Sequence, residues 1–189
     1  IANQDQVKSE SKYLNEDPTV KANYDQAVQR AEDIINATQN PELNKGTIEQ
    51  ATQAVQNAEQ ALHGVEKLNQ DKTTASKELN NLTNLTDAQR EKLKELINHS
   101  DSRDDIKQEL EQAKQLNNAM EQLKNQVALK DSVHSSSNYF NEDSAQKQAY
   151  DDAIKHAEDI IKNTNNPNIN PQDIIKALNN IKTCLLYTS

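Results

Sequence analysis

The chain has 189 residues, of which 27% are charged and 33% hydrophobic, and its net charge is −9. With two glycines, four prolines, one phenylalanine and no tryptophan, the composition favours an all-α fold of slim bundles with cores of Leu, Ile, Val and Ala. The acidic balance and the lack of Lys/Arg runs argue against binding to nucleic acid or to an anionic membrane surface. Direct membrane insertion is not expected, because no stretch approaches the roughly 18 apolar residues of a membrane span. The start of the chain also lacks the apolar region of a signal peptide, so we expect a soluble fragment.

A long phrase occurs twice in the chain. YDQAVQRAEDII begins at Tyr24 and YDDAIKHAEDII begins at Tyr150, 126 positions later. At this offset, residues 21–55 agree with residues 147–181 at 15 of 35 positions, and the match extends upstream without a gap to the start of the chain. Such a match at a fixed period indicates a repeated structural module.

Residues from about 67 to 122 have no counterpart in this repeat. The order is therefore one kind of module, a different module, and the first kind again, and we expect the modules to span residues 1–66, 67–122 and 123–182. The only cysteine, Cys184, lies in the closing TCLLYTS, where the Asn-rich style of the chain stops. Residues 183–189 are interpreted as a vector-derived tail, and the cysteine-free remainder excludes a disulfide scaffold or a thiol nucleophile.

The repeated phrase predicts a helix of about 20 residues in each copy. Asp17-Pro18 marks the start of this helix in the first copy, and Asp143-Ser-Ala-Gln146 is read as a capping box at the same place in the second. Asn40-Pro41 and Asn166-Pro167 end the two helices, because the residue before proline resists the helical region. Three- and four-residue steps then predict the buried face of the first copy: Tyr24, Ala27, Ala31, Ile34, Ile35 and Thr38.

The next helix is predicted to open at the capping box Thr47-Ile-Glu-Gln50 and at Asn170-Pro171 in the second copy. Its apolar rhythm continues without a turn cluster to about residue 82, so a single helix is expected. Gly64 lies inside this helix, and a bend at 64–72 is the open alternative. The apolar positions expected to face the core run at this rhythm: Ile48, Ala51, Val55, Ala58, Leu62, Val65, Leu68, Ala75, Leu79 and Leu82.

The middle module contains a short helix and the start of a long one. Thr86-Asp-Ala-Gln89 predicts a capping box, and residues 98–101 end the short helix. A stripe from Ile106 to Val127 predicts a long helix that leaves the middle module and enters the second copy. We therefore expect tandem three-helix bundles that share long helices and form an elongated rod. The short helix has a predicted apolar face: Leu93, Leu96 and Ile97.

Catalytic and metal-binding patterns are weak. The four histidines lie outside any HExxH, CxxC or triad-like phrase: His63, His99, His134 and His156. His156 has Asp152 and Asp159 at helical spacing, but on an amphipathic helix this spacing is more typical of a solvated face than of a metal site. No glycine-rich loop is present to hold a phosphate. We expect no enzymatic activity, no metal and no cofactor.

The phrase Ser-x-Tyr-x-Asn-Glu-Asp occurs at residues 11–17 and 137–143. In one interpretation its tyrosine fixes the loop on the bundle, and its aspartate caps the next helix. In the other, the tyrosines are exposed anchors for a partner, with one site per copy of the repeat. Under this second hypothesis the partner-binding residues are Tyr13, Asn15, Glu16, Tyr139, Asn141 and Glu142.

The phrase YDxAxxxAEDIIxxTxNP, followed by LTNLTDAQREKLKELI and EQAKQLNNAMEQL, resembles the FIVAR and GA modules of giant staphylococcal surface proteins, the extracellular-matrix-binding proteins. The resemblance covers residues 1–182 and implies three-helix modules, an extracellular place on the bacterial cell wall, and attachment to host fibronectin or another matrix protein. In related GA modules the second helix can bind serum albumin. Here that helix reads DAQREKLKELINHS and needs its apolar residues for the core, so albumin binding by this copy is not expected.

Three functions are compatible with these observations. The first is an adhesive repeat module of a bacterial surface fibre that binds host matrix weakly in each copy and gains avidity from repetition. The second is a structural spacer that projects other domains. The third, an intracellular coiled-coil scaffold, is disfavoured by irregular heptads that Asn-Pro loops interrupt. We expect a monomeric fragment, because no helix is apolar all round. At its end we expect residues 183–186 to be helical, Leu185 to be partly buried, and residues 187–189 to fray.

Overall fold

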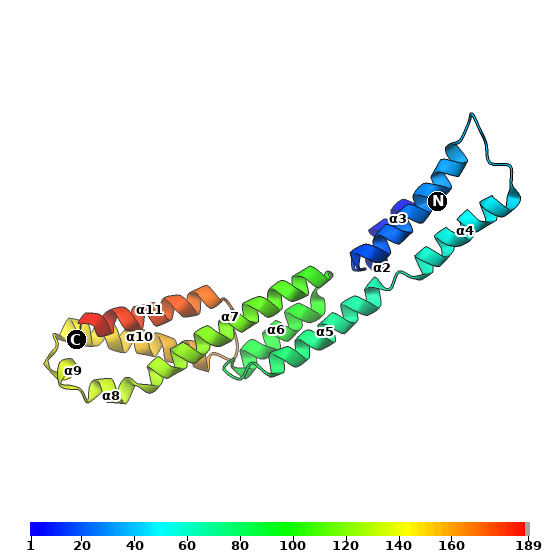
Figure 1. The fold of residues 1–189 in the computed structure, drawn as a ribbon. Helices are drawn as coiled ribbons and strands as arrows, with labels where there is room; N and C mark the ends of the chain where they lie inside the picture. The colour runs from blue at the N-terminus through cyan, green and yellow to red at the C-terminus, as the bar shows by residue number, and fades with distance from the viewer. Residues whose placement is uncertain (188–189) are drawn as a thin grey trace. The chain divides into compact units, whose positions relative to one another are not determined.

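The computed structural model describes residues 1–187, which form α-helices joined by short loops (Figure 1). This part of the chain contains no strand, and the predicted all-α class is confirmed. The helices in chain order are α1 (Gln4–Ser9), α2 (Ser11–Leu14), α3 (Pro18–Asn36), α4 (Lys45–Gln60), α5 (Gly64–Asn80), α6 (Asp87–His99), α7 (Arg103–Ala128), α8 (Lys130–His134), α9 (Ser137–Asn141), α10 (Ser144–Lys162) and α11 (Pro171–Tyr187).

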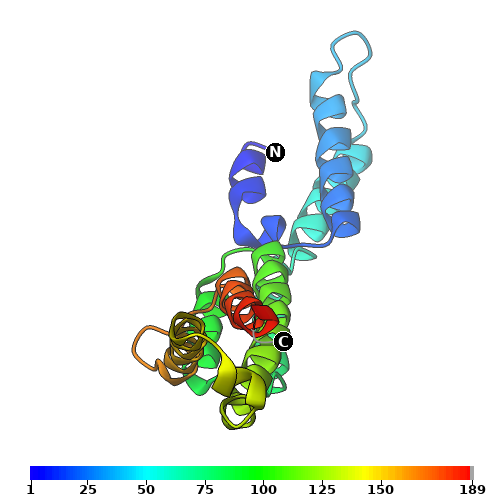
Figure 2. The ribbon, with the colours of Figure 1, turned by 90° about the vertical axis from the view of Figure 1, so that its left-hand side faces the viewer.

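The helices divide between two compact units. The first unit consists of residues 1–73 with residues 101–104, and the second consists of residues 74–100 with the chain from residue 105 onward. In the first unit α3 and α4 lie side by side as an antiparallel hairpin (Figure 1). Figure 2 shows the short helices α1 and α2 next to this hairpin, so the repeated module forms a three-helix bundle whose first helix is broken.

The core of the first unit joins all three parts of this bundle. Val7 from α1, Tyr24 and Val28 from α3, and Leu62 after α4 form one buried cluster, as the helical spacing predicts for Tyr24. Burying such side chains supplies about 1.5–3 kcal/mol each, which is the main force that holds short helices on a hairpin. Ile35 and Thr38, however, were expected on the same face and are exposed, and Thr38 lies beyond the end of α3.

The expected continuous helix from Thr47 to about residue 82 is wrong. α4 ends at Gln60 and α5 begins at Gly64, because the His63 N–H does not continue the helical ladder but donates to Glu16 Oε2 at 2.5 Å. Val65, predicted to face the core, is exposed, whereas the predicted stripe otherwise continues across the break with Leu62, Leu68, Ala75 and Leu79 buried.

Helix starts follow local chemistry at some positions and tertiary contacts at others. At α6 the predicted capping box is confirmed: Gln89 N donates to Thr86 Oγ1 at 3.2 Å, and Thr86 N donates to Gln89 Oε1 at 3.0 Å. The box predicted at Thr47 is wrong, because the N-cap of α4 is Asn44, three residues earlier. The box predicted at Asp143 is also wrong, since this side chain makes no capping bond although it occupies the N-cap position.

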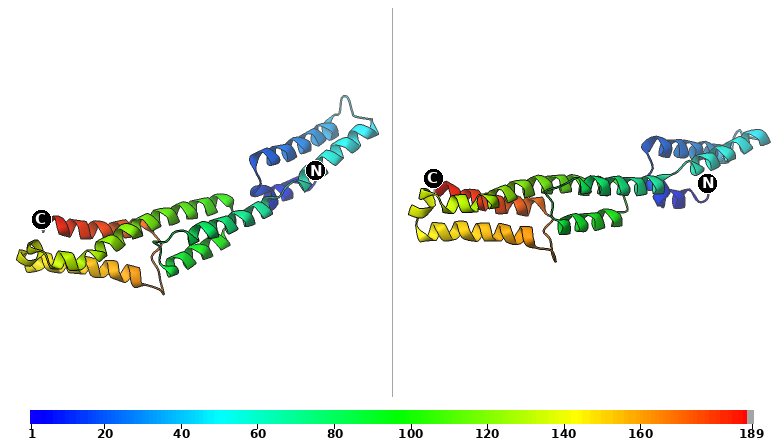
Figure 3. Two further views of the ribbon diagram at one scale, coloured as in Figure 1. Left: turned by 60° about the horizontal axis from the view of Figure 1, so that its bottom comes forward. Right: turned by 90° about the horizontal axis from the view of Figure 1, so that it is seen from below.

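The second unit contains most of the middle module and the second copy of the repeat. α10 and α11 lie side by side, and Figure 3 shows both beside the C-terminal part of α7. α6 contacts α7 through Gln89 and Met120. Leu96 was expected to face the core of α6 but is exposed, because the buried face centres on Leu93 and Ile97 and Leu96 lies to one side of it. The buried side chains of this unit come from all its long helices: Leu79, Leu93, Ile97, Ile106, Leu116, Met120, Leu123, Ile154, Ile174 and Ile181.

The last helix continues beyond residue 182 into the segment interpreted as a vector-derived tail. α11 spans Pro171–Tyr187, so residues 183–186 are helical as expected, and Leu185 is partly buried. Tyr187 is the last residue of this helix, while the fraying expected at residues 188 and 189 lies outside the described residues. A helical continuation does not decide the origin of this segment, so a vector-derived tail remains a prediction.

Candidate functional site

The repeated Ser-x-Tyr-x-Asn-Glu-Asp phrase forms the turn that leads into the long helix of each copy. It runs from α2 to the start of α3, and again from α9 to the start of α10. The Tyr13 hydroxyl donates to Asp25 Oδ2 at 2.9 Å, and the Tyr139 hydroxyl donates to Asp151 Oδ2 at the same distance. Burial and the neighbouring carboxylate raise the pKa of both tyrosines. Both hydroxyls therefore act as neutral donors that fix the turn on its own helix.

A second tyrosine in each copy lies beneath this turn. The rings of Tyr13 and Tyr24 meet edge-on with centroids 6.0 Å apart, and those of Tyr139 and Tyr150 have the same separation. Burial raises the pKa of Tyr150 to about 12. Aromatic pairs of this geometry contribute about 0.5–1.5 kcal/mol beyond the area they bury, so the turn is held by packing as well as by hydrogen bonds.

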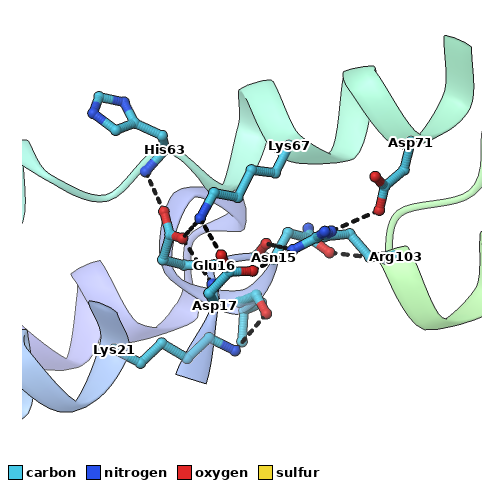
Figure 4. A network of polar contacts seen from close by, with 9 residues as sticks. Asn15, Glu16, Asp17, Lys21, His63, Lys67, Asp71 and Arg103 are labelled. Atoms are coloured by element: carbon cyan, nitrogen blue, oxygen red, sulfur yellow. Dashed lines mark hydrogen bonds and ion pairs between the residues drawn. The ribbon is translucent and has the colours of Figure 1, made fainter. Parts of the chain in front are cut away.

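In the first copy the glutamate of the phrase is buried in a polar network (Figure 4). Glu16 Oε1 pairs with Lys67 Nζ and accepts from the Asp17 N–H at 2.7 Å, while Oε2 accepts from the His63 N–H at 2.5 Å. Burial by itself raises the pKa of this carboxyl, but the hydrogen bonds from Lys67 and the two backbone N–H groups outweigh it. The pKa of Glu16 is consequently lowered, and the side chain stays ionised while buried.

Asp17 extends the network to a second cation. Its Oδ2 lies 2.7 Å from Lys67 Nζ and its Oδ1 lies 2.8 Å from Arg103 Nη1 (Figure 4). Arg103 in turn donates from Nε to Asp71 Oδ2 at 2.7 Å. Hydrogen bonds from Lys67 and Arg103 lower the pKa of Asp17. The side chain expected to cap α3 is thus used to hold the starts of α5 and α7 instead.

The Asn15 side chain forms hydrogen bonds with the backbone at the start of α7. Its side chain is buried, and Nδ2 donates to Asp101 O at 2.9 Å while Oδ1 accepts from Arg103 N at 3.1 Å. Because donor and acceptor of one amide are both used on one backbone segment, the contact specifies the position of that segment as well as binding it.

Gly64 brings α5 into contact with the backbone of the same turn. A Cβ at this position would lie 2.6 Å from Lys12 O, 2.7 Å from Ser11 O and 2.8 Å from Glu16 N. These are backbone atoms that cannot move independently of α2. Glycine is therefore required here for close approach of two chain segments.

The second copy presents the same phrase without these neighbours. Asn141 and Asp143 are exposed and Glu142 is partly exposed, with Glu142 Oε1 at 3.4 Å from Asp143 N. The turn itself keeps its shape, because Lys147 Nζ donates to Phe140 O at 2.7 Å as Lys21 Nζ donates to Leu14 O at 2.7 Å in the first copy. The difference between the copies therefore lies in what packs against the turn.

The six residues predicted to bind a partner fall into three environments. Tyr13 and Tyr139 are half-buried, Asn15 and Glu16 are buried in the network, and Asn141 and Glu142 reach solvent to different degrees. Each copy brings its three residues together on one turn, while partner binding by them stays a prediction.

The sequence does not predict a place in this network for four residues: Gly64, Lys67, Asp71 and Arg103. Gly64 carries a signal, as the only glycine inside an apolar stripe, but the stripe alone indicates no more than a bend. Lys67 and Arg103 carry none, since they lie 50 or more positions from Asp17 among many other charges.

Other chemistry has little support in the structure. His156, with acidic neighbours on its own helix, is exposed. Among residues 1–187 no group of three or more His, Cys, Asp or Glu side chains is placed to hold a metal ion. No helix in this range is long and apolar enough to cross a bilayer.

A chain in which one three-helix module occurs twice, around a different helical module, and which uses polar contacts where consecutive modules meet, is a helical repeat protein. The FIVAR domain model matches residues 1–63 and 119–184, and the GA module model matches residues 65–119. The chain therefore belongs to the FIVAR domain family and carries a GA module between its two FIVAR domains. The module boundaries expected at residues 66 and 122 remain a prediction.

Curated relatives extend over nearly the whole chain. The extracellular matrix-binding protein EbhA of Staphylococcus aureus strain Newman is 42% identical over 185 residues, which are 96% of this chain and 5% of EbhA. The extracellular matrix-binding protein ebh of strain USA300 is likewise 42% identical, over 2% of its length. The chain thus spans a few percent of the proteins it matches. These relatives are extracellular matrix-binding surface proteins of Staphylococcus, in agreement with the extracellular location expected from the sequence.

Solved structures agree with the fold. A crystal structure of a domain of EbhA from Staphylococcus aureus matches with a TM-score of 0.87 and 29% identity, over 100% of this chain and 74% of that one. A second structure matches with a TM-score of 0.63 and 38% identity, over 66% of this chain and 98% of that one. This second structure comes from a characterization of Staphylococcus epidermidis adherence to fibronectin mediated by extracellular matrix binding protein (Embp).

Proposed function

We propose that this chain is a repeat segment of a fibrous adhesin on a bacterial cell surface, and that it attaches to host extracellular matrix, with fibronectin as the partner, through many weak copies. The observation that carries the proposal is the repetition of one folded module with the same turn in each copy. Tandem weak sites gain avidity of about 10²–10⁴ over a single site through effective concentration. A module that binds weakly alone is therefore sufficient.

The relatives support the same function. The curated proteins are named for binding extracellular matrix, and one similar structure belongs to a protein described as mediating adherence to fibronectin. Acidic composition also suits a surface protein that must not bind nucleic acid or anionic lipid.

The turn of the second copy is the proposed contact surface. Tyr139 is fixed by Asp151, while Asn141 and Glu142 offer polar groups beside the exposed ring of Phe140. A rigid aromatic residue surrounded by polar groups is typical of protein-binding surfaces. The corresponding surface of the first copy is occupied by Lys67 and its neighbours.

Binding of the full chain to immobilised fibronectin, measured by surface plasmon resonance over a concentration series, tests the proposal. An unrelated three-helix protein of similar length is the reference for nonspecific binding. The double variant Asn141→Ala/Glu142→Ala should weaken the response at least about fivefold. The matched control Asn69→Ala/Glu66→Ala removes the same residue types from an exposed part of α5 and should leave binding unchanged.

A spacer module is the alternative, and one observation favours it. In the first copy Asn15 and Glu16 serve an intramolecular junction, so the phrase has a structural use that needs no partner. If the chain binds fibronectin no better than the unrelated protein, the spacer function replaces the adhesive one. If binding is specific but both double variants behave alike, the contact surface lies elsewhere on the chain.

A further inference from the structure

We infer that Asn141, Glu142 and Asp143 form a docking surface for the start of a helical module of the GA kind. The partner would present a glycine, a lysine three residues later, and an arginine at the start of a later helix. This inference concerns contacts between modules and uses Asn141 and Glu142 of the proposed fibronectin contact, so a docked module and fibronectin would compete for this turn. It rests on the comparison of one phrase in two environments within the same chain.

The surface is already formed in the second copy. The tyrosine-to-aspartate bond measures 2.9 Å in both copies, and the lysine bond to the carbonyl of the residue after that tyrosine measures 2.7 Å in both. The two tyrosine rings also meet at 6.0 Å in both. Little ordering entropy is therefore lost when a partner docks, because the turn is pre-organised.

The chemistry of the occupant follows from the first copy. There the glutamate and aspartate share a lysine, the aspartate also binds an arginine, and the asparagine amide binds backbone N–H and C=O groups. In the second copy the equivalent carboxylates and amide are partly or fully exposed. A partner with two cations at the same spacing matches this surface in charge and in hydrogen-bond direction.

Shape restricts the occupant further. The backbone atoms that surround Gly64 belong to Ser11, Lys12 and Glu16, whose equivalents are Ser137, Asn138 and Glu142. A Cβ at the glycine position would meet this backbone at 2.6–2.8 Å. A module that carries any side chain at that position is excluded, which makes the glycine a specificity determinant.

The test lengthens the chain at its C-terminal end in register. Residues 1–183 are joined to a second copy of residues 58–128, because residue 184 corresponds to residue 58 at the repeat offset of 126. This places a second Gly64, Lys67 and Arg103 after the phrase at 137–143. Amide hydrogen exchange of 137–143, followed by mass spectrometry, should slow at least about tenfold in the longer chain relative to the original chain.

Matched variants separate the proposed contact from a general effect of length. Gly64→Ala in the added copy should restore the original exchange rate of 137–143 while leaving 11–17 unchanged. The same substitution in the original copy should accelerate exchange within residues 1–73, including 11–17, and not in 137–143. Glu142→Gln should destabilise the second copy in the longer chain and have no effect in the original chain.

A second test uses the chain at its present length. The double variant Lys12→Asn/Leu14→Phe gives residues 11–17 the same sequence as residues 137–143. The amide exchange rates of residues 63–73 should then stay within about twofold of those in the unsubstituted chain. The inference is overturned if these residues lose protection. It is also overturned if 137–143 exchange equally fast in the longer chain, or if Gly64→Ala in the added copy leaves the slower exchange intact. Fibronectin binding is measured in a separate experiment. A failure of the docking inference can therefore be told apart from a failure of the proposed fibronectin binding.

Discussion

The two copies of the repeat are covered by neighbouring helices at opposite ends of their bundles. In the first copy the Asn-Glu-Asp turn is covered by the start of α5, while the loop between α3 and α4 leaves Leu43 86% exposed. In the second copy the turn is open, and the corresponding loop is covered, so that Pro167 is buried where Pro41 is exposed. Each copy therefore lacks the contact that the other has.

One residue shows how strongly the neighbour decides burial. Ile48 and Ile174 occupy the same position of the repeat, but Ile48 is 43% exposed and Ile174 is fully buried. At the covered end Gln89 of α6 donates to Asn168 O at 2.7 Å and contacts Met120 Sδ at 3.4 Å. A single repeat does not bury its apolar surface alone, as is general for repeat proteins.

Inside the bundle, by contrast, equivalent positions of the two copies carry different polar residues. The ion pair of Lys8 with Asp25 becomes a contact of His134 with Asp151, at 2.9 and 2.7 Å. The Gln4 bond to a glutamate of α3 becomes an ion pair of Lys130 with the equivalent glutamate of α10 at 3.0 Å. The positions of polar contacts within a copy are kept while their chemistry changes. The junction between modules depends on particular residues.

Gly64→Ala should give the largest difference between the copies. Added volume against the backbone of α2 costs about 2–3 kcal/mol, because the obstructing atoms cannot rotate away. Segment-resolved hydrogen exchange should show this loss in residues 1–73 and not in 137–187. Gly46→Ala is the matched control: its Cβ would meet only the Asn44 side chain, at 3.2 Å, within the first turn of α4. Equal effects of the two substitutions would refute the close-approach argument.

Asn15→Ala should destabilise the first copy by about 1–3 kcal/mol, since it removes a buried amide that binds the Asp101 carbonyl and the Arg103 N–H at the start of α7. Asn141→Ala removes the same residue from an exposed position and should change stability by less than about 0.5 kcal/mol. Urea denaturation with exchange readout in each copy measures both. A cost at Asn141 as large as that at Asn15 would contradict the open state of the second turn.

Acidification should weaken the first junction before it affects the second turn. The pKa of Glu16 is lower in the folded chain than in the unfolded one, so its contribution is complete above about pH 4.3 and is lost as pH falls through the folded pKa. Exchange of 11–17 should therefore accelerate below about pH 4 relative to 137–143. Glu16→Gln should remove most of this pH dependence; the remainder comes from Asp17, whose carboxyl also faces Lys67 and Arg103. Parallel acceleration of both turns would show that the network does not control it.

Much of the fold could be predicted from the sequence because it depends on near neighbours. The repeat register, the long helices α3 and α10, and the Thr86 capping box depend on residues within a few turns of one another. Helical spacing alone places Tyr24 and Tyr150 in the core, and both are buried.

Several of the misses share one physical cause. The break before α5 depends on Glu16, 47 positions from His63, and the exposure of Ile48 depends on the absence of a neighbour at that end among the described residues. Asp17 occupies the predicted N-cap, but Lys67 and Arg103 bind its carboxylate. Patterns within one module carry no information about such pairings, because the partners belong to the next module.

Tyr13→Phe and Tyr139→Phe should give the smallest difference in stability between the two copies, because both substitutions remove the tyrosine–aspartate hydrogen bond that the copies share. Each substitution removes one hydroxyl that donates at 2.9 Å to a half-exposed aspartate, and each should cost about 0.5–1.5 kcal/mol within its own copy. The aspartates keep another partner, Lys8 in the first copy and His134 in the second, so neither carboxylate is stranded. Urea denaturation of both variants at neutral pH should therefore give costs within about 0.5 kcal/mol of each other. A much larger cost for Tyr139→Phe would mean that the second turn depends on its tyrosine for order that the first obtains from α5, and that the open docking surface is less well formed than its hydrogen-bond distances indicate.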